Sequence, residues 1–317
     1  MEATRRFLTG MGLPAGDAHD LPTSNKRFPD GAQYRIEIPS TEGPAALAAL
    51  IEEARRYAIT IHRISQGSGV MLLTDDEIRE MARLASGAQM EINLFARPNA
   101  AWDTGAMAVA SGGKTVGPRL RGQDQLVYCL EDIKRAASLG IRSVLLADEG
   151  ALWVAGEMRR AGELPAGMQF KISVMMASAN PAAIRLMERL GADTFNIPTD
   201  LTLAQIAAIR QAVDIPLDIY VEVPDDLGGF VRLYEIPELV RIAAPVYIKF
   251  GLRNAPNIYP SGGHIESVAI ALSRERVRRA KIGLDLLQRY YPDAVMSEPG
   301  APGLALPVID DKKRGAD

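Results

Sequence analysis

Apolar residues along the chain alternate between two spacings. Short runs with an apolar residue at every second position are followed by longer runs with apolar residues three or four positions apart. The first spacing predicts strands and the second predicts amphipathic helices. The expected strands cover residues 33–38, 59–64, 89–96, 143–147, 169–176, 193–198, 216–223 and 245–250. The expected helices cover residues 44–57, 74–86, 123–139, 150–162, 180–190, 202–213, 228–243 and 266–291.

This order of elements predicts an α/β fold, a (β/α)8 barrel of the TIM type. Such a barrel repeats a strand and a helix eight times over about 250 residues. A doubly wound open sheet is the main rival, but no glycine-rich dinucleotide turn follows the first strand. We therefore expect the barrel at residues 31–293, an irregular lead-in at 1–30 and a disordered tail at 294–317.

Five of the eight expected strands carry polar residues at every second position. Because the helices need apolar partners, the apolar set should face them and the polar set should point into the barrel. Charged side chains removed from water must be paired or must bind a charged group. The barrel interior should therefore hold a salt-bridge network, an active site, or both. The inward charged residues would be Arg35, Glu37, Glu91, Lys171, Asp218, Glu222 and Lys249, with Arg35, Glu91, Lys171 and Asp218 deep and structural.

Residues near the carboxyl ends of the strands are candidates for chemistry, because barrel enzymes carry their active sites at that face. Glu37 and Glu222 are predicted as a general acid/base pair, or as ligands of a divalent metal ion. Lys249 is the third catalytic candidate, as an anion-binding group or as a Schiff-base amine, although nearby carboxylates would keep it protonated. His62 is expected to be a core histidine rather than a ligand. The predicted substrate-binding residues are Asn93, Arg97, Lys114, Arg119, Arg121, Asn196, Arg253 and Asn254.

The stretch AMAVASGGKTVGPRLRG, residues 106–122, resembles a phosphate-binding loop only at first sight. Ala108 stands where such a loop needs glycine, and Gly117 and Pro118 prevent a helix from starting at the phosphates. The expected loop from 97 to 122 lies at the carboxyl face and is unusually long for its type, which is typical of a lid or binding loop. Its cations Lys114, Arg119 and Arg121 could close over an anionic group, or they could simply be solvated.

The composition of this 317-residue chain limits the classes of partner and the location that we expect. A net charge of −3 argues against nucleic acid and anionic membranes. No signal-peptide core and no apolar run approaching 18 residues is present, so we expect a cytoplasmic protein. The single cysteine, Cys129, excludes an internal disulfide or a multi-cysteine metal site within one chain, and its helical context indicates a buried thiol. A homo-oligomer or hetero-oligomer remains possible on these grounds.

Residues 173–229 resemble peptidase family U-32, the collagenase-like peptidases. The resemblance rests on the helix pattern from Asn180 to Leu190, the Gly191-Ala192 turn, Leu201-Thr202-Leu203 with Ile206, and Asp218-Ile219-Tyr220-Val221. It implies a barrel fold and a hydrolase. The family's His-Gly-Ala-x-Cys segment is replaced here by residues 222–226, so no catalytic residue can be carried over. Relatives that hold an iron–sulfur cluster use four cysteines, and this chain should therefore hold no such cluster.

Together these observations predict an enzyme that acts on a small anionic molecule by hydrolysis or by acid/base lyase chemistry. The alternative is a non-catalytic barrel that binds a metabolite or a partner subunit.

Overall fold

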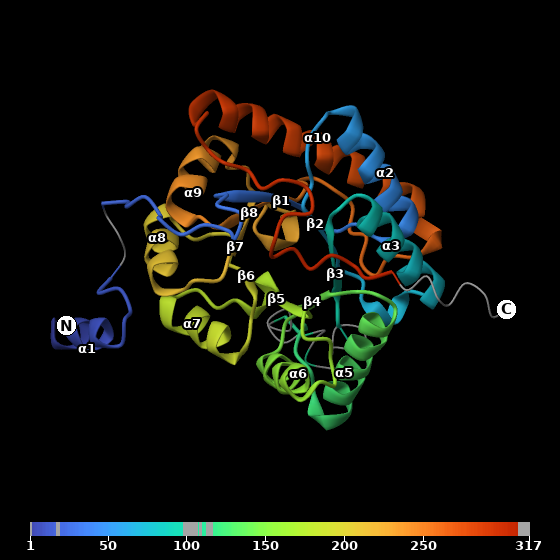
Figure 1. Ribbon diagram of the computed structural model, residues 1–317, viewed down its shortest axis with the longest axis horizontal. Coiled ribbons are helices and arrows are strands. Elements are labelled where there is room, and N and C mark those ends of the chain that lie inside the picture. Colours follow the sequence, from blue (N-terminus) through green and yellow to red (C-terminus); the bar gives the residue numbers. More distant parts are fainter. Residues whose placement is uncertain (1, 17–19, 98–106, 108–109, 112–116, 310–317) are drawn as a thin grey trace.

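Eight parallel strands close into a barrel in sequence order, from β1 to β8. The structure is a computed structural model and describes residues 2–16, 20–97, 107, 110–111 and 117–309. The helices form a ring around the strands (Figure 1). The strands are β1 (Tyr34–Ile38), β2 (Arg63–Gln66), β3 (Glu91–Phe95), β4 (Ser143–Leu146), β5 (Gln169–Ile172), β6 (Thr194–Asn196), β7 (Leu217–Glu222) and β8 (Val246–Phe250). The predicted TIM-type barrel is confirmed.

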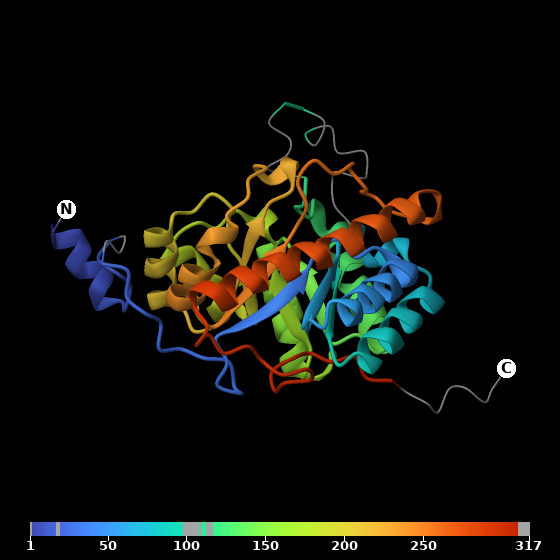
Figure 2. The same cartoon turned by 90° about the horizontal axis from the view of Figure 1, so that it is seen from above.

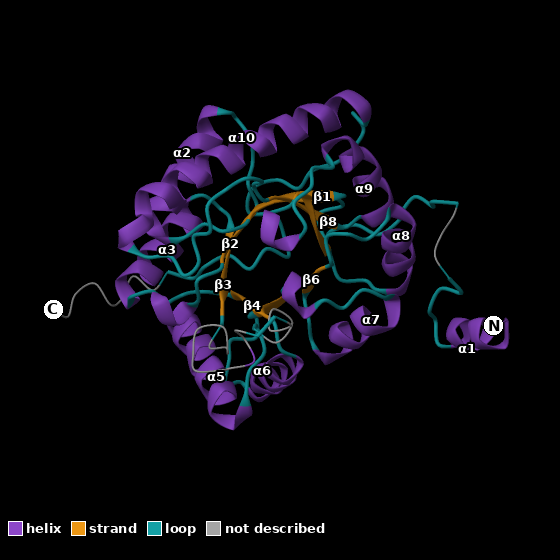
Figure 3. Ribbon diagram, turned by 180° about the vertical axis from the view of Figure 1, so that it is seen from behind, coloured by secondary structure: helices purple, strands orange, loops and turns teal. Residues whose placement is uncertain are grey.

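The helices of the ring follow the strands in turn, as Figure 3 shows from the opposite side. Three of them begin at the caps that the sequence contains. Thr74 and Thr202 each form a capping box, and Asn180 accepts a hydrogen bond from the backbone N–H of Ala183. The ring consists of α2 (Gly43–Arg56), α3 (Asp75–Gly87), α5 (Gly122–Ser138), α6 (Glu149–Ala161), α7 (Pro181–Leu190), α8 (Leu203–Ala212), α9 (Ile236–Ala243) and α10 (Glu266–Tyr290).

The apolar core lies between the strands and the helices. Apolar residues at alternate strand positions, such as Ile36, Ile92 and Phe170, are at most 1% exposed and pack with apolar helix residues in one cluster. Their polar neighbours on the same strands, such as Glu37 and Lys171, are equally buried. The predicted division into an apolar outer face and a polar inner face therefore explains the burial on both faces of the strands.

Three elements differ from the expectation by more than two residues at one end, while most others differ by one or two residues. The second strand lies at 63–66 rather than 59–64, and the fifth ends at Ile172, where a 3-10 helix (Val174–Met176) follows. Helix α9 begins at Ile236 rather than at 228. Gly228 and Gly229 adopt φ angles of 118° and 64°, which a right-handed helix does not allow. The residues before α9 instead form turns and a 3-10 helix, η5 (Leu233–Glu235).

Residues 294–309 lie across the amino-terminal mouth of the barrel, instead of forming the expected disordered tail (Figure 2). Met296 pairs with Tyr34 of β1, and the backbone oxygen of Ser297 lies 2.8 Å from Nε2 of His62. The Arg35 guanidinium donates to Oγ of Ser297 at 2.9 Å and to the backbone oxygen of Pro302 at 2.7 Å. This segment closes one end of the barrel, so only the carboxyl face is left as a mouth. Residues 310–317 lie outside the described residues.

The expected lead-in contains a helix, α1 (Glu2–Gly10), which stands apart from the ring beyond α7 in Figure 1. Arg185 of α7 donates hydrogen bonds to the backbone oxygens of Met11 and Gly12, at 3.1 and 2.6 Å. Helix α1 therefore attaches to the outside of the barrel and contributes nothing to its interior. No helix in the described parts of the chain is long and apolar enough to cross a membrane.

Candidate functional site

Five charged side chains meet inside the barrel, and we call them the central cluster: Glu37, Arg63, Lys171, Asp218 and Lys249. They come from β1, β2, β5, β7 and β8, and each is at most 3% exposed. Arg63 donates through Nε to Glu37 at 2.8 Å and also pairs with Asp218. Lys171 pairs with Glu37 and lies 3.4 Å from Asp218. Lys249 lies 3.1 Å from Oε1 of Glu37, so this one carboxylate is shared by three cations.

The charges of the central cluster determine the protonation of its members. Burial alone would raise the pKa of Glu37, but Arg63, Lys171 and Lys249 outweigh it and hold that pKa well below its usual value. Burial and the charge of Arg63 lower the pKa of Lys171 to about 7. Burial opposes the charge of Lys249, yet Glu37 outweighs it and raises the pKa of that ammonium group. Glu37 therefore stays ionised and Lys249 stays protonated at neutral pH, as expected for a lysine beside carboxylates.

Lys249 is the member of this cluster that lies next to the carboxyl end of β8. Its ammonium group donates to Oδ1 of Asn196 at 2.5 Å and lies 4.3 Å from the centre of the Tyr220 ring. Asn196 is itself fixed, because its amide nitrogen donates to the backbone oxygen of Asp218 at 3.0 Å. In the described part of the chain, Glu37 is the one carboxylate that forms an ion pair with Lys249. Arg63 and Lys171 pair with the same carboxylate. An anion next to Lys249 would therefore meet a buried, protonated and oriented ammonium group.

A second group of side chains lies at the carboxyl mouth, and we call it the mouth cluster: Ser40, Glu42, Tyr220, Tyr259 and Arg276. The hydroxyl of Tyr259 donates to Oγ of Ser40, and NH1 of Arg276 donates to the backbone oxygen of Ser40 at 3.2 Å. Ser40 has a φ angle of 57°, an uncommon conformation for a residue with a side chain. Burial raises the pKa of Glu42. Neighbouring charges couple Tyr220 to both Lys249 and Arg276, so the two clusters adjoin.

The predicted partner of Glu37, Glu222, has different neighbours. Oε1 of Glu222 accepts a hydrogen bond from the backbone N–H of Arg253 at 3.0 Å, and Oε2 lies 3.6 Å from Nε of Arg279. A register shift separates Glu222 from Tyr220 along β7, which explains why it leaves the inner row. The structure therefore does not bring Glu37 and Glu222 together as one pair. Within the described ranges, no three His, Cys, Asp or Glu side chains gather so as to hold a metal ion.

The predicted substrate-binding residues are spread over the carboxyl face, and most have partners within the protein. Arg253 pairs with Asp225 at 2.9 Å, and the backbone N–H of Asn254 donates to the same carboxylate. Arg119 pairs with Glu149, a contact that ties the end of the long loop to the start of α6. Arg119 and Arg253 therefore each have a carboxylate partner within the protein, and their role in substrate binding stays a prediction.

The remaining candidates lie in three different places. Asn93 donates to Oγ of Ser143 inside the barrel, and NH1 of Arg97 donates to the backbone oxygen of Gly67 at 3.0 Å. Arg121 is exposed immediately before α5. Lys114 and most of the predicted loop at 100–121 lie outside the described residues.

Sequence reasoning missed Arg63 as a member of the inner row. With the second strand expected at 59–64, Arg63 stood near its end, whereas it opens β2 and points at Glu37. The pattern Arg63, Ser65 on β2 carries the same every-second-position signal as the other strands and could have shown it. Arg276 and Tyr259 could not be found in this way, because one lies on a helix rich in arginine and the other lies in a loop.

Two residues have the structural roles that the sequence indicates. His62 is fully buried, its Nδ1 accepts the backbone N–H of Ile36 at 3.0 Å, and burial lowers its pKa to about 4. Cys129 is buried with its thiol 3.7 Å from the backbone oxygen of Ala96, and burial raises the thiol pKa. With one cysteine in the sequence, the chain cannot supply the four cysteines of the relatives' cluster.

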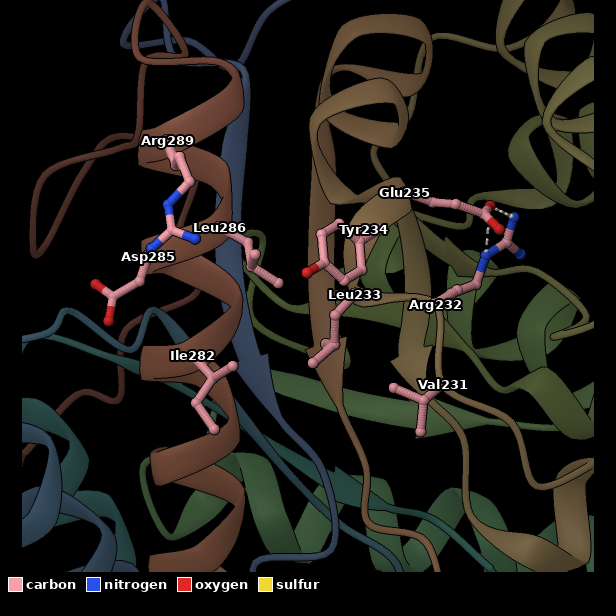
Figure 4. A pocket seen from close by; sticks show the side chains of 9 residues that line it. All are labelled: Val231, Arg232, Leu233, Tyr234, Glu235, Ile282, Asp285, Leu286 and Arg289. Atoms are coloured by element: carbon pink, nitrogen blue, oxygen red, sulfur yellow. Dashed lines mark hydrogen bonds and ion pairs between the residues drawn. The ribbon is translucent and has the colours of Figure 1, made fainter.

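A groove of about 610 Å³ lies outside the barrel, between η5 and α10 (Figure 4). Its walls carry Leu233, Tyr234, Ile282 and Leu286. Two charged residues at its rim, Arg232 and Glu235, form an ion pair with each other. The groove combines these apolar walls with charged residues at its rim, whereas the fully buried ionised groups gather in the barrel, so the carboxyl mouth is the better candidate for the functional site.

Comparison with known proteins shows that part of the chain matches a family model. Residues 119–222 match the sequence model of peptidase family U32, a stretch that covers β4 to β7 but less than half of the chain. No curated protein sequence matches significantly.

Several solved structures are similar in fold. The U32 peptidase Mk0906 is 14% identical, with a TM-score of 0.41 over 70% of this chain and 94% of its own. The dimeric Rubisco from Hyperthermus butylicus is 11% identical, with a TM-score of 0.46 over 86% and 70%. A putative lyase/mutase from Burkholderia cenocepacia J2315 is 14% identical, with a TM-score of 0.43 over 92% and 88%. The family-model match alone confirms the resemblance to peptidase family U32, over residues 119–222, which include β4 to β7 of the TIM-type barrel.

Proposed function

We propose that the chain is a barrel enzyme that binds a small anionic substrate at its carboxyl mouth and acts on it by hydrolysis or acid/base lyase chemistry. One observation carries the proposal: the buried Lys249 shares the carboxylate of Glu37 with Arg63 and Lys171, and no second carboxylate pairs with it among the described residues. A substrate anion would complete this arrangement, because a buried cation gains most from a partner that is also removed from water.

The geometry supports a division of roles between Lys249 and Glu37. Glu37 accepts hydrogen bonds from Arg63 and Lys171 and from Oγ of Ser65, the last at 2.6 Å. Its carboxylate is too strongly stabilised in the ionised form to exchange protons readily near neutral pH, so we assign it the role of a positioning residue. Lys249, which Glu37 and Asn196 orient, would stabilise negative charge that develops on a substrate oxygen.

Glu222 remains the acid/base candidate. Oε2 of Glu222 has no hydrogen-bond partner in the described part of the chain, whereas Oε1 is held by the backbone of Arg253. Oε2 lies 3.6 Å from Nε of Arg279, so its hydrogen-bonding capacity is open to a substrate that reaches it, beside an arginine. Participation of a divalent metal would have to use Glu222 with substrate oxygens, because the three cations around Glu37 oppose a further positive charge there.

Thermal melts followed by turnover measurements test the proposal. Acetate, pyruvate, malonate and inorganic phosphate would be added to the wild-type protein, each with Mg²⁺ or with EDTA. We expect at least one anion to raise the melting temperature in a saturable way, because a ligand that binds only the folded state stabilises it. Lys249→Met should abolish this shift. The control Lys281→Met removes an exposed lysine that pairs with Asp285 on α10, and it should keep the shift.

The anion that stabilises the protein would then be followed by proton NMR. Conversion by the wild type, and not by Lys249→Met, would support an enzyme. Stabilisation without any conversion would favour the non-catalytic barrel that binds a metabolite. If no anion stabilises the wild type, or if Lys249→Met responds as the wild type does, the assignment of the site is wrong.

A further inference from the structure

We infer that Arg276 anchors a carboxylate group of the substrate, in a subsite formed with Ser40 and Tyr259 at the β1–β8 side of the mouth. The inference rests on the proposed function and names the substrate class for that same mouth. It assigns the substrate as a small carboxylic acid that carries a second oxygen for Lys249.

Arg276 differs from the other arginines near it on α10. Arg274 pairs with Glu52 at 2.8 Å, and Arg278 pairs with Glu275 at 3.1 Å, both near the surface. Arg276 is only 4% exposed, and within the described residues it forms no ion pair. Its NH1 donates to the backbone oxygen of Ser40, while its Nε is buried and has no hydrogen-bond partner there.

Such an arginine is costly in a protein that binds nothing. Burying a guanidinium group without a hydrogen-bonded counter-charge loses hydration that is only partly regained, so buried arginines are normally paired. The carboxylates of Glu42 and Glu222 act on the charge of Arg276, but neither forms an ion pair with it in the described structure. The single hydrogen bond to Ser40 fixes the position of the group without neutralising it. A ligand carboxylate would supply both the charge and the two acceptor oxygens that the planar guanidinium matches.

The surroundings of Arg276 favour a carboxylate over a phosphate. The carboxylate of Glu42 lies near enough to interact with Arg276, and it is held by the backbone N–H groups of Gly67 and Ser68 at 2.7 and 3.2 Å. Because Glu42 and Glu222 already offset part of the charge of Arg276, and Glu37 that of Lys249, a carboxylate with one negative charge balances the remaining positive charge better than a phosphate with two. The Tyr259 hydroxyl donates to Oγ of Ser40, which leaves the hydroxyl proton of Ser40 to donate to a carboxylate oxygen.

Two further contacts give the subsite its boundaries. The Tyr259 ring packs on Gly67 so closely that a Cβ atom at that position would lie 2.5 Å from it, which fixes the ring over the mouth. On the other side, Tyr220 interacts electrostatically with Arg276 and has the Lys249 ammonium 4.3 Å from its ring centre. The two cations therefore flank Tyr220. A short acid can place its carboxylate at Arg276 and a carbonyl, hydroxyl or second carboxylate oxygen at Lys249.

Calorimetric titration with pyruvate, malonate and inorganic phosphate tests the inference. Arg276→Met should weaken the binding of pyruvate and malonate by about tenfold or more, because hydrogen bonds to a buried charge are strong. Arg276→Lys keeps the charge but loses the planar guanidinium with its paired N–H donors. This variant should bind with an affinity between those of Arg276→Met and the wild type. Arg274→Met is the matched control on the exposed face of the same helix, and its affinity should equal that of the wild type.

The outcomes separate this inference from the proposed function. Failure of the wild type to bind any of these anions would refute both. Binding that is lost in Lys249→Met but unchanged in Arg276→Met would refute the inference alone, as would tighter binding of phosphate than of malonate. If Arg276→Met does not fold, Arg276→Lys decides the matter, because an unchanged affinity in that variant would refute the guanidinium as the anchor.

Discussion

Glu37, which the sequence predicts as a catalytic residue, is surrounded by cations in the structure, and we propose for it the role of a positioning residue. The sequence shows a carboxylate near the end of a barrel strand, which is a common place for an acid or a base. The structure adds Arg63, Lys171 and Lys249 around it, and these three cations hold its pKa well below the usual value. The same residue type at Glu222 keeps one oxygen without a hydrogen-bond partner in the described structure. The chemistry available to each carboxylate follows from its neighbours rather than from its position in the strand.

The supporting role of Glu37 leads to a stability prediction. Glu37→Gln keeps the size of the side chain but leaves Arg63, Lys171 and Lys249 with Asp218 and, for Arg63, the more distant Glu91 as counter-charges. Removing one partner of a buried ion pair typically costs about 3 kcal/mol or more, so we expect the free energy of unfolding to fall by about that amount. Urea unfolding at neutral pH measures it. Glu52→Gln, at the exposed partner of Arg274, should change the same quantity little. Equal stability of Glu37→Gln and the wild type would contradict the supporting role.

At the scale of elements, periodicity and capping residues predict much of the barrel. Thr74, Asn180 and Thr202 mark the starts of helices. Their side chains accept hydrogen bonds from backbone N–H groups of the first helical turn, which have no partner within the helix. Helix α9 was expected too early, because the two glycines at 228 and 229 bend the chain within an otherwise helical pattern. Residues 294–309 were expected to be disordered because they are rich in proline and glycine, yet distant partners at the barrel's amino-terminal mouth order them.

The closing segment leads to a prediction about truncation. Ending the chain after residue 293 would leave His62 without the backbone oxygen of Ser297, and Arg35 without both Ser297 and Pro302. Buried polar groups that lose their partners typically cost about 1–3 kcal/mol each, so this truncation should lower the melting temperature by many degrees. A chain that ends after residue 309 keeps these contacts and serves as the control. Equal thermal melts of the two truncated chains would show that the segment contributes nothing to stability.

At the scale of the whole molecule, the site depends on distances that no local pattern contains. The side chains of the central cluster meet because the barrel closes and the strand registers bring the inner rows together. The sequence indicates that charges point inward, but which of them pair depends on the stagger between strands. Arg276 reaches the mouth from α10 and Tyr259 from the loop after β8, so their contribution appears only when the chain is folded.

The central claim is that a small carboxylate binds between Arg276 and Lys249 at the carboxyl mouth. A crystal structure of the protein with malonate tests this claim most directly. We predict one carboxylate group of malonate within hydrogen-bonding distance of the Arg276 guanidinium and an oxygen of the other within reach of the Lys249 ammonium. Malonate found only in the outer groove between η5 and α10, or a mouth that stays empty at saturating malonate, would contradict the account.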